Sequence, residues 1–562
     1  MPNSKRIATV VIHGMGEQNP MGTMSGFVKS FLAYEEYKNL LTPGQNYFST
    51  PTDVGDSYEV QKWIVKKTDY RPRVDFFELY WAPLMTDNQF SHVFPWMKKI
   101  LFMKSKNWRL QCLKLILVVS LIAIPILSFG WVLSISKLFY NHFIDFGMIN
   151  HFYLILFTAL IIGFSVLKVK SLRVALGFSL LAFSFYGYYS IDDIADTYNS
   201  DSDKWKLIIG TLICIGYIFK FTGKFLKEFL ADAARYFEPQ PNNVKNRDEI
   251  RQLGVSILES ISLDDSYDRI IIVSHSLGSA VGYDILRLYW AKHGGRYHLD
   301  NADRDFLIEY QENMESVLYC KKEDNKNNDL VGKEVCEDSE DKRCLKYQKI
   351  QNNLFNDLST FEGKSAVDKL ELRWKISDFI TTGSPLSKMK IFYSNGKDTD
   401  EWVHRFERTI VTNPPTLDLE TDGFYFTKDE DDGPSKGSHR FHHGSLFAFT
   451  RWTNIFHRTD LIGGNISQVI GKGTLNINLE IPKVGNPFNL LGWFHNRSPL
   501  MHSHYWSNIS HRNKLKGEPS DKQIMENELD KTKFEKDLAF GAIEKIYNAM
   551  HLHTSVIKTK NV

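Results

Sequence analysis

The stretch RIIIVSHSLGSAVGYDIL, from Arg269 to Leu286, passes from a strand to a helix within a few small residues. Ile270–Val273 is a short, continuous apolar run of the kind that forms a buried strand, and a helical pattern follows at once. The turn SHSLG between them has the form of a nucleophile elbow, which lifts a serine hydroxyl clear of a sheet. We therefore predict that Ser276 is a nucleophile at the end of a strand.

The Ser-x-Gly triplet alone is a weak signal, since roughly two or three arise by chance in a chain of this length. Ser128, Ser394 and Ser435 also stand in such triplets. Only Ser276 lies between an apolar strand and a helix. Ser274 occupies the place of the first glycine of the usual elbow, and its small side chain should be tolerated there. The alternative interpretation is a buried strand-to-helix turn without chemistry.

The composition of the 562-residue chain limits the classes of function. Its formal net charge is only +2, which argues against binding nucleic acid through bulk charge, and its aromatic content of 14% suits apolar or membrane-facing surfaces. The five cysteines form no CxxC pair, so neither a disulfide framework nor a zinc ribbon is indicated, and a reducing, cytosol-facing environment fits. We expect no metal and no other cofactor.

The middle of the chain has the composition of a membrane segment. The run LILVVSLIAIPILSFGWVLSI, residues 115–135, holds 21 residues without a charge, close to the length that crosses a bilayer core of about 30 Å. The candidate spans are 112–135, 148–167, 172–191 and 205–221. The last has an apolar centre of only 13 residues, so it either spans with help from its flanking residues or is an interfacial or buried helix.

Basic residues indicate the orientation of this segment. Lysine and arginine crowd before the first candidate span, between the second and third, and after the fourth, whereas the other two loops have few. The positive-inside rule then places both long flanks in the cytosol. An even number of spans is also required if the chain before and after the segment belongs to one fold. We therefore expect an integral protein of the bacterial inner membrane, with the catalytic domain and both termini cytoplasmic.

A second motif lies near the N-terminus. The apolar run Ile7–Ile12, too short for a signal peptide, is interpreted as a first strand and ends in HGMGEQ. A His-Gly-x-Gly loop after a strand is typical of an oxyanion hole, because glycine lets the backbone approach a developing negative charge. Gly14 and Gly16 would allow this approach, and the N–H of Met15 would be a donor. His13 is expected to pack in the loop rather than act as a base.

Two segments connect or follow these motifs without chemistry of their own. Residues 292–370 form a charged insertion that is interpreted as a surface insertion, with a lid or partner site as the alternative. Near the C-terminus, residues 534–550 are expected to form a docking helix. Between the N-terminal motif and the elbow, Arg73–Leu84 also alternates enough to be a strand.

Later motifs supply the groups that a serine nucleophile needs. A serine hydroxyl requires an adjacent base, histidine suits this role because its pKa lies near operating pH, and a carboxylate fixes the tautomer of the histidine. The strand in FAFTRWTNIFHRTDLIGG delivers Asp460 at its end, and PLMHSHYWSN supplies His502 and His504. We assign Ser276 as nucleophile, His502 as base and acid, and Asp460 as the orienting acid. The N–H of Leu277 would be the second oxyanion donor.

Alternatives to these assignments remain. His504 is a rival base, and Asp378 is a rival acid, although it lies inside a predicted strand rather than beyond its end. His439, His442 and His443 in SHRFHHG could bind a metal together with His504. A surface or loop cluster is favoured, because no carboxylate recurs at ligand spacing.

The order nucleophile, acid, histidine is that of α/β-hydrolases. More closely, the chain resembles class 3 (triacylglycerol) lipases and uncharacterised bacterial membrane-inserted serine hydrolases. The resemblance rests on the turn Gly383–Pro385 after a strand, on Asn454 before the acid, on Tyr505 three residues after the histidine, and on the segments HGMGEQ and YWAPL. It covers about half of the chain. It implies hydrolysis of an ester or lipid without identifying the substrate.

The sequence therefore predicts an α/β fold, namely an α/β-hydrolase core with a mostly parallel sheet, interrupted by a helical transmembrane insertion of about four spans. The expected parts are 1–95 for the N-terminal part of the core, 96–224 for the insertion, 225–291 for the core with the elbow, 292–370 for the charged insertion, and 371–562 for the C-terminal part of the core.

We expect a membrane-anchored serine hydrolase that cleaves an acyl ester, in particular a lipid, as a lipase, phospholipase or esterase does. Its expected partners are the lipid or ester substrate and the bilayer. One alternative is a non-catalytic hydrolase-fold protein that binds membranes or acts as a scaffold. A channel or transporter with a regulatory domain is disfavoured, because the candidate spans contain no acidic or basic residue apart from flanking groups.

Overall fold

The computed structural model describes most of residues 6–85, 231–319, 338–361, 374–389 and 411–479, together with residues 542–552 and a few single positions that include His502 and Tyr505. The four candidate spans lie outside the described residues apart from Lys114. Among the helices that the structure does describe, none is both long enough and apolar enough to cross a bilayer. The membrane segment therefore stays a prediction.

Contacts divide the chain into two units. The first comprises residues 1–86, 239–393 and 399–562, and the second comprises residues 87–238 and 394–398. The second unit contributes the described helix α8 (Ala231–Phe237). All other elements described below belong to the first unit.

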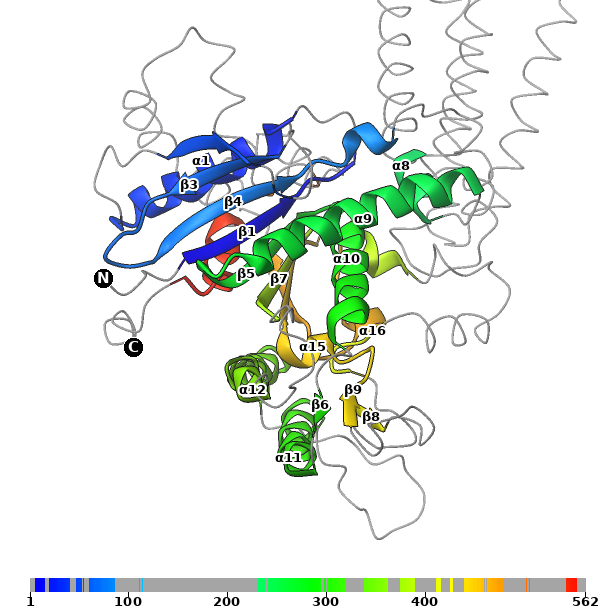
Figure 1. Ribbon diagram of the computed structural model, residues 1–562. Coiled ribbons are helices and arrows are strands. Elements are labelled where there is room, and N and C mark those ends of the chain that lie inside the picture. The colour runs from blue at the N-terminus through cyan, green and yellow to red at the C-terminus, as the bar shows by residue number, and fades with distance from the viewer. Residues whose placement is uncertain are drawn as a thin grey trace, which may run out of the picture. The chain divides into compact units, whose positions relative to one another are not determined.

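An eight-stranded sheet forms the centre of the first unit (Figure 1). Its strands are β1 (Arg6–Ile12), β2 (Phe48–Pro51), β3 (Gln61–Val65), β4 (Arg73–Leu79), β5 (Tyr267–His275), β7 (Ile376–Thr382), β10 (Arg451–His457) and β11 (Leu475–Leu479). Their order is β11-β10-β7-β5-β1-β4-β3-β2, with every pair from β11 to β4 parallel and the pairs β4–β3 and β3–β2 antiparallel. The predicted α/β class with a mostly parallel sheet is therefore confirmed.

The central strands have the sequences that a sheet buried on both faces requires. In β1, every residue from Ile7 to Ile12 is buried, and β5 has a continuous buried run through Ile270–Val273. Parallel strands covered by helices on both faces are near-continuous apolar runs rather than alternating ones. The apolar runs Ile7–Ile12 and Ile270–Val273 therefore lie side by side, with Val11 opposite Val273.

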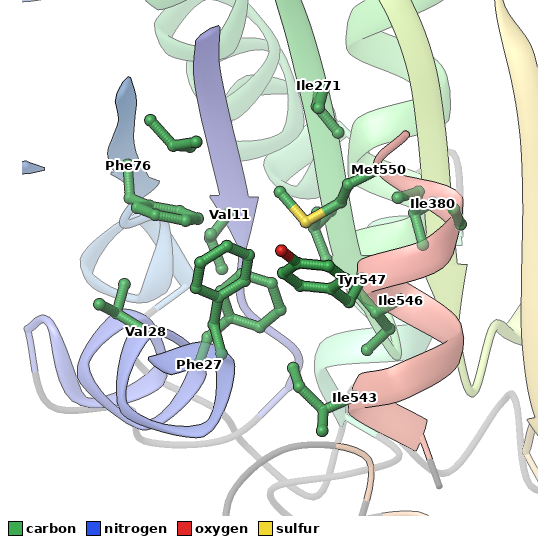
Figure 2. Packing of buried hydrophobic residues seen from close by; sticks show 14 of the residues in the cluster. Val11, Phe27, Val28, Phe76, Ile271, Ile380, Ile543, Ile546, Tyr547 and Met550 are labelled. Atoms are coloured by element: carbon green, nitrogen blue, oxygen red, sulfur yellow. The ribbon is translucent and has the colours of Figure 1, made fainter. Parts of the chain in front are cut away.

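One face of the sheet is covered by α1 (Gly22–Tyr37) and by a helix over residues 542–549 (Figure 2). Side chains of the two helices and of the strands form one buried cluster, which includes Val11, Phe27, Val28, Phe76, Ile271, Ile380, Ile543, Ile546, Tyr547 and Met550. The segment expected as a docking helix is thus, over its described part, a structural layer of the first unit.

The other face is covered by α9 (Pro241–Leu263) and α10 (Gly278–His293). A Cβ placed on Gly282 of α10 would lie 2.8 Å from Ser274 Oγ and 3.1 Å from Ile12 Cδ1. These residues alternate with Val273 and Val11 of the first cluster, so α10 lies on the opposite face of the sheet. The first unit is a three-layer α/β/α structure.

The region of the charged insertion contains two helices, α11 (Asn301–Leu318) and α12 (Glu340–Phe361), which pack against each other. Gln348 of α12 donates to the carbonyl oxygen of Trp452 at 3.3 Å, and Gln351 donates to that of Thr450 at 3.2 Å. These carbonyls stand at the beginning of β10, whereas Asp460 follows its end. The described part of the insertion therefore packs beside the amino end of a central strand.

A small antiparallel sheet, β6-β9-β8, accompanies these helices. Its strands are β6 (His298–Leu299), β8 (Tyr425–Thr427) and β9 (His439–Phe441). Four short helices complete the described elements: η2 (Ala82–Met85), η6 (Pro385–Lys388), α15 (Leu446–Phe449) and α16 (Ser467–Ile470).

Candidate active site

Two of the predicted site residues lie just beyond the carboxyl ends of parallel strands in the same sheet. Ser276 directly follows β5, and Asp460 follows β10 by three residues, with β7 between these two strands. Carboxyl ends of parallel strands meet at one edge of a sheet, which is the usual place for a ligand site in an α/β fold.

Ser276 adopts a backbone conformation that is costly for any residue except glycine. Its φ is 52°, in the left-handed region, where a side chain costs about 1–2 kcal/mol. The turn is held by two backbone hydrogen bonds, from Ser276 N–H to Thr382 O at 2.9 Å and from Ser279 N–H to Ser276 O at 2.9 Å. Such strain persists only where the surroundings over-determine it, and it concentrates at functional sites.

Glycines bring the elbow close to the neighbouring strand ends. A Cβ on Gly278 would lie 2.3 Å from His13 O, and one on Gly14 would lie 2.9 Å from Ser276 Cβ. Both contacts are shorter than a real Cβ permits, so these positions require glycine. They place the loop after β1 directly against Ser276.

The departure from the usual elbow at Ser274 is accommodated by a compensating glycine. Ser274 is fully buried, and its hydroxyl has no hydrogen-bond partner among the described residues. Gly282 of α10 packs against this hydroxyl, and because glycine has no Cβ it leaves room for the Ser274 side chain. The left-handed turn at Ser276 therefore forms without a glycine at position 274.

Ser276, His502 and Asp460 form a continuous hydrogen-bonded chain. Ser276 Oγ lies 2.6 Å from His502 Nε2, and His502 Nδ1 lies 2.9 Å from Asp460 Oδ2. A carboxylate only accepts, so Nδ1–H donates to Asp460 and Nε2 is left to accept the serine proton. All three side chains are buried, with relative exposures of 1%, 3% and 0%.

Asp460 is held as a carboxylate by several donors. Its Oδ1 accepts from Ile462 N–H at 2.8 Å, and its Oδ2 accepts from the hydroxyl of Tyr505 at 2.8 Å. Burial opposes the charged form, but the attraction of His502 together with hydrogen bonds from His502, Gly463 and Ile462 outweighs it. The pKa of Asp460 is therefore well below its usual range.

His275, the residue before Ser276, contacts the backbone of His502, the predicted base. Its Nε2 lies 3.0 Å from His502 O, and the two imidazole rings stack with centroids 5.2 Å apart. Burial, followed by the repulsion of His502, lowers the pKa of His275 to about 3, so its ring is neutral at neutral pH. Because a carbonyl oxygen accepts, Nε2 of His275 carries the proton and anchors His502.

His13 connects the loop after β1 to the end of β4. Its ring stacks on Trp81 with centroids 4.8 Å apart, and its Nε2 accepts from Trp81 N–H at 3.0 Å. Its Nδ1 must then carry the proton, which it donates to Gly14 O at 2.8 Å. Burial lowers the pKa of His13 to about 4, so the imidazole remains neutral. The Gly14–Met15 peptide is oriented by this contact, and in a trans peptide its N–H points away from His13.

Leu277 stands just before the first residue of α10. Backbone N–H groups at a helix N-terminus have no intrahelical acceptor, and the helix dipole favours negative charge there. Met15 is buried beside Gly14 in the adjacent loop. Gly16 and the rival base His504 lie outside the described residues.

The rival acid Asp378 lies away from this chain of hydrogen bonds. It is in the middle of β7, where it forms ion pairs with Arg451 at 2.8 Å and with Arg269 at 3.4 Å. Burial opposes its charged form, but these guanidinium groups and His551 hold the pKa of Asp378 below its usual range. Asp378 is therefore a partner of buried arginines in the sheet.

The histidine-rich loop forms no metal site in the part of the chain that the structure describes. The rings of His442 and His443 are 3.9 Å apart. Within the described ranges, no group of three or more His, Cys, Asp or Glu side chains is placed to hold a metal ion.

Sequence reasoning did not assign a role to His275, Trp81 or Tyr505. Each forms its contact across many positions in the chain: His275 with His502, Trp81 with His13, and Tyr505 with Asp460. For two of them, proximity to a motif was the available signal. His275 stands directly before Ser276, and Tyr505 stands three residues after His502. Searches against protein-family models, curated proteins and solved structures found no match for this chain.

Proposed function

We propose that the protein is a membrane-anchored serine hydrolase that cleaves an acyl ester, with a lipid as the favoured substrate. The observation that carries the proposal is the left-handed Ser276 with its Oγ 2.6 Å from His502 Nε2 and Asp460 behind the histidine. A strained strand-to-helix turn, a base and a carboxylate in this order are what nucleophilic acyl transfer requires.

In the proposed mechanism, His502 Nε2 takes the proton of the Ser276 hydroxyl while Oγ attacks the ester carbonyl carbon. The electron pair of the carbonyl bond moves to its oxygen, and the N–H groups of Leu277 and Met15 stabilise the resulting oxyanion. His502 then gives its proton to the leaving alkoxide, which departs as an alcohol. Water repeats the sequence on the acyl-enzyme and releases the carboxylic acid.

Asp460 serves this mechanism as a charged residue that orients the imidazole. Its lowered pKa keeps it ionised when His502 becomes an imidazolium, and the pair of opposite charges lowers the cost of that step. The neutral ring of His275 beside His502 adds no competing positive charge.

The fold proposed for the first unit is an α/β-hydrolase core, with the chain order nucleophile, acid, histidine at the carboxyl edge of a parallel sheet. The proposed anchor is the apolar stretch of residues 112–221 in the bacterial inner membrane, with both termini in the cytosol. An enzyme held at a bilayer meets a high local concentration of membrane-partitioned esters, which favours a lipid substrate.

A fluorophosphonate probe tests the proposed nucleophile. The wild-type protein in detergent should be labelled, and Ser276→Ala should not. Ser279→Ala is the matched control and should be labelled like the wild type. Ser279 is as buried as Ser276 and lies in the first turn of α10, and its hydroxyl has no hydrogen-bond partner in the described structure. Labelling that survives in Ser276→Ala, or folded wild-type protein that never labels, contradicts the proposal and favours a non-catalytic binding protein.

A panel of esters tests the substrate class. We expect hydrolysis of phospholipid or acylglycerol in proteoliposomes with a higher kcat/KM than that of a short-chain nitrophenyl ester in the same vesicles. A clear advantage for the soluble ester would exclude the lipid proposal while leaving the serine mechanism intact.

A further inference from the structure

Tyr505 contacts the same carboxylate oxygen as the proposed base. Its hydroxyl donates to Asp460 Oδ2 at 2.8 Å, and this oxygen also accepts from His502 Nδ1 at 2.9 Å. The tyrosine oxygen in turn accepts from His457 N–H at 3.0 Å. Tyr505 is only 1% exposed, so water does not compete for these hydrogen bonds.

Two donors, His502 and Tyr505, share the negative charge of one acceptor, Asp460 Oδ2. A hydrogen bond from a neutral hydroxyl to a buried carboxylate stabilises the anion and reduces the negative charge that it presents to its other partner. An imidazolium beside Asp460 is therefore stabilised less when the Tyr505 hydroxyl is present than when it is absent. The backbone N–H groups of Ile462 and Gly463 also stabilise the carboxylate, and that of Ile462 donates to the other oxygen, Oδ1.

The tyrosine is also fixed at a second point. The hydrogen bond from His457 N–H ties its oxygen to the last residue of β10, three residues before Asp460. A Cβ on Gly383, which has a left-handed φ of 58°, would lie 2.8 Å from Tyr505 Cε2 and 3.0 Å from His502 Cε1. The turn after β7 therefore supports both rings.

We propose that Tyr505 is a positioning residue that weakens the pull of Asp460 on the His502 proton and thereby sets the pH range in which His502 acts as a base. The inference deepens the proposed function and rests on it. It assigns a role to the hydroxyl itself, beyond the packing of the aromatic ring.

Other titratable groups face this site. The ring of His275 lies 5.2 Å from that of His502 and 5.7 Å from that of Tyr505, and the ring of His457 lies 5.2 Å from that of Tyr505. The low pKa of His275 keeps it neutral throughout the range of the test. His457 needs its own control.

The test is the pH dependence of kcat/KM for a neutral ester in Tyr505→Phe. Removing the hydroxyl should move the acidic limb of the profile to higher pH by about half a unit to one unit, because the protonated His502 gains stability. The plateau of kcat should fall less than about tenfold, with KM unchanged.

Tyr547→Phe is the matched control. Tyr547, labelled in Figure 2, belongs to the same buried cluster as Tyr505. Its hydroxyl also donates to a buried carboxylate, that of Glu35, at 2.8 Å. The Tyr547→Phe variant should lower the thermal midpoint by about as much as Tyr505→Phe does. Its pH profile should be the same as that of the wild type. An unmoved acidic limb in Tyr505→Phe, or an equal shift in Tyr547→Phe, overturns the inference.

A His457→Gln variant keeps the backbone N–H and removes the imidazole. The acidic limb should persist in it, and its loss would assign the limb to His457 and overturn the inference. A second readout needs no turnover: the titration midpoint of His502, followed by NMR on protein with labelled histidine. A shifted midpoint in Tyr505→Phe without ester hydrolysis by any variant would support the contact and refute the proposed function alone.

Discussion

Glu78 is a buried carboxylate whose ionisation should destabilise the first unit. It lies on β4 next to Val11 of β1, at 2% relative exposure. Neither carboxylate oxygen has a hydrogen-bond partner of normal geometry within the described residues, although the backbone N–H groups of Met21 and Met24 face the charge. Burial outweighs these donors and raises the pKa of Glu78 from 4.5 to about 7.

The sign of the effect follows from the direction of the shift. The folded state binds the proton of Glu78 more tightly than the unfolded state, so the free energy of unfolding falls as pH rises from about 4.5 to 7. The penalty is absent below pH 4.5 and complete above pH 7. A shift of about 2.5 units corresponds to about 3 kcal/mol.

Glu78→Gln keeps the size and shape of the side chain and removes its charge. At pH 8 the variant should be more stable than the wild type by about 3 kcal/mol, which is about 4 °C in the thermal midpoint for a domain of this size. At pH 4.5 the two midpoints should coincide. Differential scanning calorimetry across this pH range measures the thermal midpoints of the wild type and of Glu78→Gln.

Glu35→Gln is the matched control, since it makes the same chemical change on the same face of the sheet. Glu35 is buried in an ion pair with Arg71 and accepts from Tyr547, so its neutralisation should destabilise the protein at pH 8. A Glu78→Gln variant that is less stable than the wild type at pH 8 would refute the reasoning. It would mean that the carboxylate is charged and stabilises the N-terminus of α1.

Four further outcomes are expected. Asp460→Asn should lower kcat by about 10⁴-fold with little change in KM, measured by ester hydrolysis, because it loses the tautomer that lets Nε2 accept a proton. His13→Phe keeps the ring on Trp81 but loses the hydrogen bond to Gly14 O, so kcat should fall toward the roughly 10²-fold cost of one oxyanion donor. Gly278→Ala should lower the thermal midpoint and slow fluorophosphonate labelling, because its Cβ would meet His13 O at 2.3 Å. Position 199 lies between the third and fourth candidate spans, in a loop that the predicted topology places outside the cytosol. Asn199→Cys should therefore react with an impermeant thiol reagent from outside the cell, and labelling only from the cytosol would contradict this topology.

The sequence predicted those parts of the fold that depend on local pattern. Continuous apolar runs at Ile7–Ile12 and Ile270–Val273 identified two central strands, because a parallel sheet buried on both faces leaves no polar alternation. The turn at Ser276 was also predictable from the sequence, since a strand and a helix joined by SHSLG, with its small residues Ser274, Ser276 and Gly278, must meet in a sharp turn. The positions of Asp460 and His502 followed from what a serine nucleophile needs.

The packing of two helices could not be predicted from the sequence, for physical reasons. Residues 340–361 have a highly charged composition, yet α12 uses buried glutamines to satisfy backbone carbonyls at the start of β10. A polarity pattern cannot separate such a helix from a solvated surface. Residues 542–549 were predicted as a helix, but their place in the main core depends on contacts with α1, more than 500 residues earlier in the chain.

The contacts around Ser276 indicate what maintains its strained backbone. Thr382 of β7 accepts the N–H of Ser276, and the loop after β1 approaches Ser276 Cβ so closely that only glycine fits at position 14. The register that pairs Ser274 with both Ile12 and Thr381 brings these three strand ends level. A shift of either neighbouring strand by one residue would remove a support and reverse the faces of its side chains. The backbone geometry of Ser276 therefore depends on the registers of the central sheet.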